Sequence, residues 1–379
     1  MDVQSWLNDR TVYITLAGSR AYGLETKDSD WDYRGAAIAP PEYYTGMLNF
    51  EQADSKGTMQ LVKDRMGEYP TDNAEITVWS LKKMVSLAAD GNPNMIELMF
   101  MDPSDIVMCN HEVMDPFFNI RDSFVSKLLK HRFSGYAMQQ LKRIRNHKRW
   151  MDHPPSLPTR EQFGIEGVNF AKDQAFACDK LIELQVDQWL VDQTHLPEDI
   201  KIQLGPEMVR MVNVILEQIQ VETKIDRIKD VLERAANRHL GFDADFINFL
   251  TKFKAYRAAK AEYQSYLTWK KQRNPVRAEL ERKFGYDTKH GMHLVRLLRM
   301  AREILETGKV LVKRHHDGEE LKALRYYGIW SYEELVGWAE EEDAALEEVM
   351  QKSALPKSAN RKLISRTLTD VTMKYLEAV

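Results

Sequence analysis

The chain has 379 residues, of which 44% are hydrophobic and 29% are charged. A chain of this length usually folds into more than one domain, so we expect two. Because the formal net charge is -4, a nucleic acid, if one binds, is expected to contact a local basic surface rather than a general positive field. The composition is that of a soluble globular protein without a membrane-spanning run or a signal-peptide pattern, so we expect no membrane partner and a cytoplasmic location. The two cysteines, Cys109 and Cys178, lie far apart in sequence without metal-ligand spacing, which argues against a disulfide framework and a zinc site.

The first hundred or so residues mix strand patterns with helix patterns. Residues 11–17 (TVYITLA) are rich in β-branched and aromatic side chains and predict a buried strand. Residues 31–39 predict its neighbour and residues 75–78 (EITV) predict a third strand. A helix is expected over residues 80–89, and another begins at Asn92, which serves as the N-cap before a proline at the first helical position.

Beyond about residue 115 the strand patterns nearly vanish and long helical patterns begin. The predicted helices cover residues 124–151, 167–193, 206–220, 225–237, 244–272 and 288–306. The last has Asp287 as its N-cap and Gly308 after its final turn, and Ser331 with Glu334 forms a capping box that opens a further helix. The expected fold is α+β, with a small α/β domain over residues 1–115 and a large all-helical domain over residues 116–379.

A Gly-Ser pair and two acidic residues follow each other at the start of the chain. Gly18 and Ser19 close the first strand and can open a helix whose free N–H groups bind phosphate oxygens. Asp30 and Asp32 are spaced to share one face of the next strand. Their mutual repulsion is relieved by a shared proton or by a divalent cation. Because phosphates beside these carboxylates would add more negative charge, the pattern favours the metal.

Two-metal phosphoryl or nucleotidyl transfer usually needs a third carboxylate. Glu75, at the head of the EITV strand, is the best candidate, because its neighbours Ile76 and Val78 are expected to point to the core. Asp72, just outside this strand, is the reserve choice. An isolated Asp-x-Asp is more often a turn or a solvated strand edge. The succession of strand, Gly-Ser, helix, acidic strand and third acidic strand is more specific.

These motifs resemble the DNA polymerase β superfamily of nucleotidyltransferases. Its pattern of a hydrophobic residue, Gly-Gly or Gly-Ser, a gap, and alternating Asp and hydrophobic residues is matched by AGS at residues 17–19 and DWDY at residues 30–33. Within the superfamily the chain is similar to a group of predicted nucleotidyltransferases from bacteria and phages, some of which are linked with RNA repair. The matching segments are residues 18–35, 80–100, 273–308 and 330–335.

The resemblance implies nucleotide transfer from an NTP with Mg²⁺ (or Mn²⁺), and it leaves the acceptor open. One departure concerns the third acidic position, where Glu75 stands in place of the commoner aspartate. The additional methylene leaves the role of Glu75 as a metal ligand open.

Several cationic side chains near the first motif could bind a triphosphate. Arg20 and Lys27 flank the Gly-Ser turn and could pair with phosphates; the alternative is that both are solvated loop charges. Arg34, two positions past Asp32, could neutralise a phosphate or balance the acids. Asp28 is expected to be a turn residue.

A second set of cations lies on the predicted helix 288–306. Lys289, His293 and Arg296 fall on one face and could hold the triphosphate or the phosphates of the acceptor; the alternative is a solvated basic face opposite an apolar core side. His290 and His293 are three residues apart, but without a nearby Glu or Cys partner a zinc site is disfavoured.

A basic cluster on the predicted helix 124–151 ends in Trp150. Its cations are Lys142, Arg143, Arg145, Lys148 and Arg149. The cluster could follow a nucleic-acid backbone while the indole stacks on a base. A solvated helix surface explains the same pattern.

The expected function is magnesium-dependent transfer of NMP from an NTP to an acceptor hydroxyl at a nucleic-acid end, with RNA preferred over DNA. Asp30 and Asp32 would hold both metals, Glu75 would complete the site and activate the hydroxyl, and Gly18 and Ser19 would bind the triphosphate. The alternatives are transfer to a protein or a small molecule, and a non-catalytic module that senses nucleotides. The complete acidic set argues against the sensing module. Base preference, template use and oligomeric state stay open.

Overall fold

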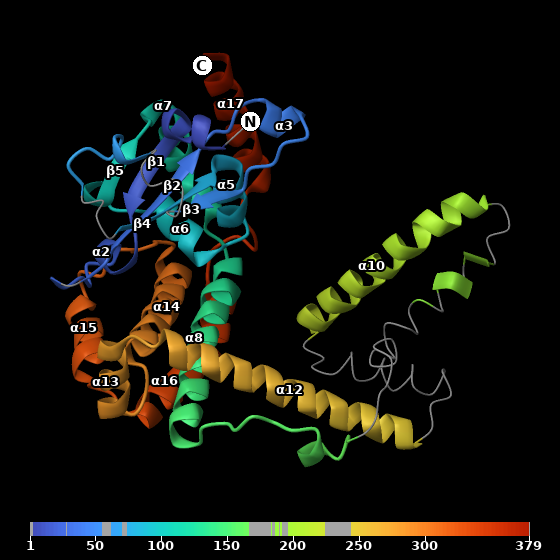
Figure 1. Ribbon diagram of the computed structural model, residues 1–379. Helices are drawn as coiled ribbons and strands as arrows, with labels where there is room; N and C mark the ends of the chain where they lie inside the picture. The colour runs from blue at the N-terminus through green and yellow to red at the C-terminus, as the bar shows by residue number, and fades with distance from the viewer. Residues whose placement is uncertain are drawn as a thin grey trace. The chain divides into compact units, whose positions relative to one another are not determined.

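The computed structural model describes most of the chain (Figure 1). The described residues are 3–27, 29–54, 62–69, 74–166, 183, 186–188, 190–191, 196–223 and 244–378. Asp28, Asp72 and the predicted helix 225–237 lie outside the described residues, as does most of the predicted helix 167–193.

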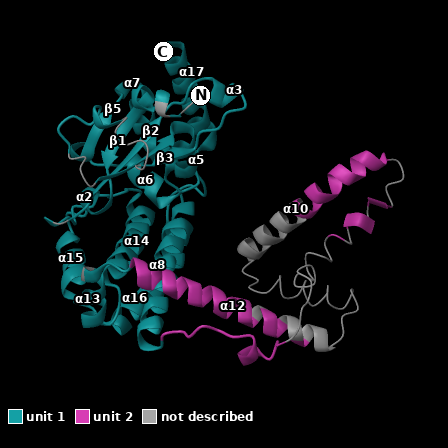
Figure 2. Cartoon of the chain, in the orientation of Figure 1, with its two compact units in different colours: residues 1–153, 273–379 teal, residues 154–272 magenta. Residues whose placement is uncertain are grey.

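The chain divides into two compact units (Figure 2). Unit 1 consists of residues 1–153 and 273–379, and unit 2 consists of residues 154–272. These bounds differ from the predicted domains 1–115 and 116–379, because helices from both sides of residue 115 contribute to one hydrophobic core in unit 1. The predicted boundary followed the change from mixed to helical sequence patterns, and as a division into domains it stays a prediction.

The described strands of unit 1 form a five-stranded sheet with the order β3-β4-β2-β1-β5. The strands are β1 (Thr11–Leu16), β2 (Trp31–Ala37), β3 (Gln52–Asp54), β4 (Ala74–Ser80) and β5 (Ile106–Cys109). β2 and β4 pair in parallel, and the other described pairs are antiparallel. The three predicted strands correspond to β1, β2 and β4 and are confirmed. β3 and β5 were not predicted, because segments of three or four residues are too short to show a period.

Some helices of unit 1 pack on the sheet, and others pack on one another beside it. The described α-helices of this unit are α1 (Leu7–Arg10), α2 (Gly18–Ala21), α3 (Glu42–Thr45), α5 (Leu81–Ala89), α6 (Pro93–Met99), α7 (His111–Asn119), α8 (Leu128–Asp152), α13 (Pro275–Phe284), α14 (Thr288–Thr307), α15 (Gly318–Tyr327), α16 (Tyr332–Lys352) and α17 (Arg361–Ala378). The α+β fold class is therefore confirmed.

Hydrophobic cores lie on both faces of the sheet. Tyr13 and Ala36 belong to the core shared with α5, α6, α8 and α14, whereas Ile14, Tyr33 and Ile76 belong to the opposite core. Burial on both faces explains why every residue of β1 is buried and why its sequence, TVYITL, has no alternation of apolar and charged residues. α14 packs along α8 and contacts α15 and α16 (Figure 1), so the helix carrying the predicted cations is central to unit 1.

The predicted helix caps are confirmed. The Asn92 side chain accepts from the N–H groups of Asn94 and Met95, and the Asp287 side chain accepts from the N–H of His290 at 3.1 Å. Gly308 ends α14 in the left-handed conformation at φ +71°. Ser331 and Glu334 form the predicted capping box of α16.

Unit 2 contains two long helices in its described part. They are α10 (Glu198–Thr223) and α12 (Ala244–Gln272). The bounds of α12 match the prediction, whereas α10 begins at Glu198 and carries Pro206 in its interior, so the predicted start at Pro206 is wrong. None of the described helices combines the length and apolar character that crossing a membrane requires.

Candidate active site

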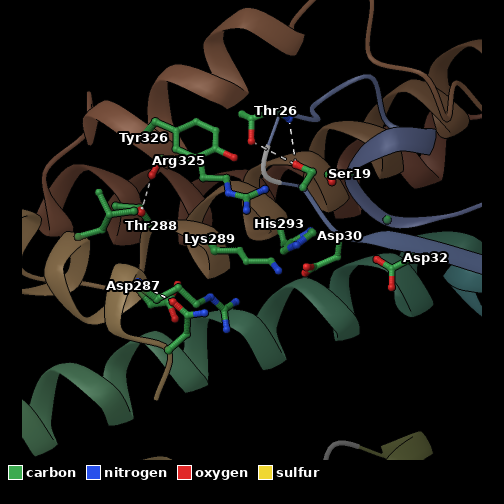
Figure 3. Close-up of a pocket in the computed structure, with 15 residues that line it drawn as sticks. Ser19, Thr26, Asp30, Asp32, Asp287, Thr288, Lys289, His293, Arg325 and Tyr326 are labelled. Carbon is green, nitrogen blue, oxygen red and sulfur yellow. Dashed lines mark hydrogen bonds between the residues drawn. The ribbon is translucent and has the colours of Figure 1, made fainter. Parts of the chain in front are cut away.

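A pocket in unit 1 contains the acidic motif and several cations (Figure 3). Its cavity volume is about 450 Å³. The N-terminal part of the chain contributes Gly18, Ser19, Thr26, Ser29, Asp30 and Asp32 to its lining. The C-terminal part contributes Asn274, Arg277, Leu280, Asp287, Thr288, Lys289, His293, Arg325 and Tyr326.

The acidic side of the pocket lies where β1 ends and β2 begins. Asp30 is exposed and directly precedes β2, and Asp32 is its second residue and half-buried. The Ala17 N–H donates to the Asp32 carbonyl oxygen at 2.8 Å, which ties the end of β1 to the start of β2. Among the residues that the structure describes, neither carboxylate has a Lys, Arg or His nitrogen within 4.0 Å. Both carboxylates are therefore accessible to a bound cation.

Glu75 lies beside Asp32 on the neighbouring strand. The parallel register pairs Asp32 with Glu75 and Tyr33 with Ile76. Paired residues of adjacent strands point to the same face, and the strands are about 4.8 Å apart. Ile76 and Val78 are fully buried in the opposite core, as predicted. Glu75 is exposed and is not part of the pocket lining, so its role as the third metal ligand stays a prediction.

Gly18 occupies a position that a side chain could not share with Asp32. It has φ +63°, and a Cβ at this position would lie 2.5 Å from Asp32 Oδ2. The close approach explains why glycine follows the first strand, since glycine alone combines a positive φ with no side chain. α2, which starts here, is only four residues long. The expected phosphate-binding helix is therefore a single turn.

We expect Gly18→Ala to reduce nucleotide transfer by about 10²-fold, because displacing a reacting group by about 1 Å has an effect of this size. The added methyl group would push the Asp32 carboxylate out of place and strain the backbone. Initial rates at saturating NTP measure the loss. Gly67→Ala is a matched control, because Gly67 has φ +62° and open space at its Cβ position. Equal losses in both variants would show that backbone strain alone causes the effect.

Arg20 supports the segment that leads to Asp30. Its Nε donates to the Asp30 carbonyl oxygen at 3.2 Å and its guanidinium also donates to the Ser29 carbonyl oxygen at 2.8 Å. The guanidinium carbon lies 3.5 Å from the centroid of the Trp31 ring. Arg20 is absent from the pocket lining, so its contacts favour a positioning role over the predicted phosphate contact.

The structure leaves two other predicted cations outside the pocket lining. Lys27 is exposed, and Arg34 donates to the Tyr33 carbonyl oxygen at 2.8 Å and lies 6.0 Å from the Trp79 ring centroid. Nucleotide binding by either residue stays a prediction.

The cationic side of the pocket combines residues from three helices. Lys289 and His293 of α14 line the pocket. Burial, together with Arg296 and Lys289, holds the pKa of His293 well below its ordinary value, so His293 contributes a neutral imidazole rather than the predicted cation. Figure 3 shows the Lys289 side chain directed toward Asp30. Arg277 of α13 and Arg325 of α15 also line it, and sequence reasoning missed both. Arg277 is part of the RNPVR sequence at residues 273–277, whereas Arg325 had no recognisable signal.

These cations perturb one another. Burial, together with Arg277 and Arg325, lowers the pKa of Lys289, although Asp30 and Asp32 oppose this effect. Burial and Arg277 also lower the pKa of Arg325. The Nε atom of Arg277 is buried without a hydrogen-bond acceptor among the described residues. A polyanion in this pocket would supply the missing acceptors and relieve the repulsion.

Comparison with known proteins supports the predicted resemblance. Residues 2–153 match a family described as the RNA repair pathway DNA polymerase beta family. The resemblance to polymerase-β-like nucleotidyltransferases of the RNA-repair group is thus confirmed over these residues. The uncharacterized protein YcgL of Bacillus subtilis (strain 168) is 30% identical over 93 residues, which are 24% of this chain and 31% of that protein. No solved structure matches the chain.

The polymerase-β-like segment contributes six of the fifteen residues that line the pocket. It includes the sheet, Gly18, Asp30 and Asp32, whereas Lys289 and Arg325 lie outside the matched residues. The family match therefore accounts for the acidic side, and the cationic side is known from the structure of this chain alone.

Arg296 differs from the prediction. It is 3% exposed, and one of its terminal nitrogens lies 2.5 Å from Glu97 Oε1. Its guanidinium carbon is 3.7 Å from the centroid of the Tyr22 ring, whose hydroxyl donates to Glu97 Oε2 at 2.8 Å. Arg296 does not line the pocket, because the buried Glu97 carboxylate turns it inward. The expected contact of Arg296 with phosphate is thus replaced by a buried ion pair with Glu97.

The basic cluster of α8 is partly neutralised. Arg145 forms an ion pair with Glu340, and Lys148 lies 3.4 Å from Asp152. Trp150 is 6% exposed, and its ring stacks on His147 with centroids 5.7 Å apart. The prediction that this indole is available to stack on a base is therefore wrong.

Proposed function

We propose that the chain is a metal-dependent nucleotidyltransferase that transfers NMP from an NTP to an acceptor hydroxyl, with an RNA end as the acceptor. The observation that supports this proposal is the composition of one pocket, which places Asp30 and Asp32 opposite Lys289, Arg277 and Arg325. Carboxylates suit divalent cations and the basic residues suit a triphosphate. A volume of about 450 Å³ is in the usual range for small-molecule sites.

The acidic residues fit Mg²⁺ or Mn²⁺, which prefer oxygen ligands. Asp30 and Asp32 would hold the metal ions, and Glu75, paired with Asp32 in the sheet, would complete the ligand set. Bound metal ions of this kind neutralise phosphate charge and lower the pKa of a coordinated hydroxyl.

The protein residues would bind and orient the reactants. Lys289, Arg277 and Arg325 would pair with the β- and γ-phosphates, and the backbone of Gly18 and Ser19 would donate hydrogen bonds to phosphate oxygens. In the reaction the acceptor oxygen forms a bond to the α-phosphorus, and the bond from this phosphorus to the bridging oxygen breaks. Pyrophosphate leaves, and the hydroxyl proton passes to solvent or to a nearby carboxylate.

The proposal is tested by label transfer. The purified full chain is incubated with Mg²⁺, each α-labelled NTP in turn, and separate RNA ends, DNA ends or whole-cell protein. Label on RNA supports the proposal as stated and reveals the base preference. Label on protein or DNA alone would overturn the RNA acceptor, and nucleotide binding without any transfer would favour a sensing module.

Lys289→Met is expected to raise the Kd for NTP about 10- to 100-fold, since a hydrogen bond to a charged group contributes about 1.5–3 kcal/mol. The affinity can be measured by calorimetry at two salt concentrations, and the variant should show the weaker salt dependence. Lys309→Met is the control, because Lys309 is exposed and does not line the pocket. An unchanged Kd in Lys289→Met would place the triphosphate elsewhere.

A further inference from the structure

A cluster of His147, Asp287 and His290 lies next to the pocket. One ligand atom from each residue lies within 4.8 Å of the other two. His147 comes from α8, Asp287 is the N-cap of α14, and His290 belongs to its first turn. We propose that this His–Asp cluster binds a Zn²⁺ ion that joins α8 to the start of α14. The sequence disfavoured zinc at His290 and His293 because neither has a nearby Glu or Cys partner, whereas His147, which completes this cluster, lies far away in the chain.

The ligand types and their burial suit zinc. Imidazole nitrogens and a carboxylate oxygen are common zinc ligands with bond lengths of about 2.0–2.2 Å. The side chains of His147 and His290 are each 14% exposed, and that of Asp287 is 7% exposed. The cluster is therefore largely screened from solvent. Three protein ligands leave one tetrahedral position for water.

A hydrogen bond fixes the orientation of the His290 ring. Its Nδ1 lies 2.8 Å from Gln140 Oε1, and because this oxygen only accepts, Nδ1 carries the hydrogen. The lone pair is then on Nε2, which lies 3.6 Å from Asp287 Oδ2. Two acceptors that face each other are stabilised by a metal ion or a proton between them. Zinc would supply that metal ion, and Gln140 would act as the outer partner that metal-bound histidines usually have.

A carboxylate lies behind the His147 ring, at a longer distance than Gln140 lies from His290 and without a hydrogen bond to the ring. The His147 Nδ1 atom lies 3.4 Å from Oε1 of Glu281, a carboxylate that is 2% exposed and accepts a hydrogen bond from Arg273 at 2.7 Å. A buried carboxylate behind an imidazole is typical of zinc sites, because it orients the ring and increases its basicity.

A second cluster in the described residues provides a contrast. Glu303, His316 and Asp317 also bring three ligand atoms within 4.8 Å of one another. There the fully buried Arg314 guanidinium already pairs with Glu303 at 2.6 Å and with Asp317 at 2.8 Å. Asp287, in contrast, has no Lys or Arg nitrogen within 4.0 Å among the described residues. Among the described residues, Asp287 thus lacks an arginine partner of the kind that Glu303 and Asp317 have in Arg314.

Zinc at this position would stabilise the part of α14 that forms the pocket. Asp287 itself lines the pocket, and Lys289 and His293 extend into it from the same end of the helix (Figure 3). The zinc site is separate from the acidic site at Asp30 and Asp32, so it neither requires nor replaces the proposed catalytic metals.

The test measures metal bound to the purified full chain. The chain is loaded with Zn²⁺ and dialysed against metal-free buffer, and its zinc content is measured by inductively coupled plasma mass spectrometry. We expect about one Zn²⁺ per chain, and Co²⁺ substitution should give the intense visible absorption of a four-coordinate site. A wild-type chain without retained zinc and without this absorption would overturn the proposal.

Variants locate the ion. His290→Gln and His147→Gln should each weaken Zn²⁺ binding by more than tenfold, and Gln140→Ala by about 10- to 100-fold, the range for outer partners. His316→Gln and the Asp30→Asn/Asp32→Asn double variant should retain the wild-type affinity. If zinc is lost in the acidic double variant and kept in His290→Gln, the ion belongs to the acidic site and the proposal fails. Circular dichroism verifies that each variant is folded.

Discussion

Replacing Asp30 and Asp32 together with asparagine is expected to reduce label transfer at least about 10³-fold, because the loss of charge stabilisation in a transition state has effects of this size for each group removed. Asparagine keeps the volume of each side chain and removes its charge, so the fold should persist. Both side chains line the same pocket. In the described part of the chain, no Lys, Arg or His nitrogen lies within 4.0 Å of either carboxylate. Single-turnover assays with an α-labelled NTP measure the loss.

Nucleotide binding separates this effect from a general failure of the pocket. Measured with chelator and without added metal, NTP affinity should be unchanged or higher in the double variant, because Lys289, Arg277 and Arg325 then face two fewer negative charges. The matched control is Asp9→Asn/Asp64→Asn, which changes two exposed carboxylates away from the pocket. Transfer at the wild-type rate in the Asp30→Asn/Asp32→Asn variant would refute the assignment of these residues as metal ligands.

The second large effect concerns stability. Glu97→Gln is expected to lower the free energy of unfolding by about 3–5 kcal/mol, as observed when one partner of a buried ion pair is removed. Arg296 would then keep its charge in a site that is 3% exposed, where its other contacts among the described residues are the Tyr22 ring and the Met300 sulfur. Urea unfolding monitored by circular dichroism measures the difference.

A double variant distinguishes the charge from the packing. Glu97→Leu/Arg296→Met replaces the pair with apolar side chains of similar size, and we expect its stability to be close to wild type. Glu348→Gln is the exposed control, because Glu348 pairs with Lys352 on the surface, and it should leave the unfolding midpoint nearly unchanged. If Arg296→Met weakens NTP binding without a loss of stability, Arg296 binds nucleotide, as the helical spacing first indicated.

The fold was largely predictable because its signals are local. The strands β1, β2 and β4 show runs of β-branched and aromatic residues, and α14 is delimited by its own caps, Asp287 and Gly308. β3 and β5 lack such signals, since pairing with a neighbouring strand defines them rather than their composition.

The site was predictable only in part. Helical spacing predicts which residues share a face of a helix, but it does not predict which other parts of the protein that face contacts. Lys289 and His293 line the pocket, but Arg296 turns to Glu97, which lies 199 positions away in sequence. Arg277 and Arg325 enter the pocket from separate helices through tertiary packing. A sequence pattern within a short segment does not predict contacts between residues that lie far apart in the chain.

The division of unit 1 into two chain segments has a consequence for biosynthesis. A ribosome releases the sheet with Asp30 and Asp32 first, then the whole of unit 2, and only afterwards α13, α14 and α15. A nascent or truncated chain that ends before residue 273 therefore presents the acids without the Lys289 and Arg325 partners that line the finished pocket. Premature termination should therefore remove the cationic side of the pocket together with α14, which packs along α8 in the core of unit 1.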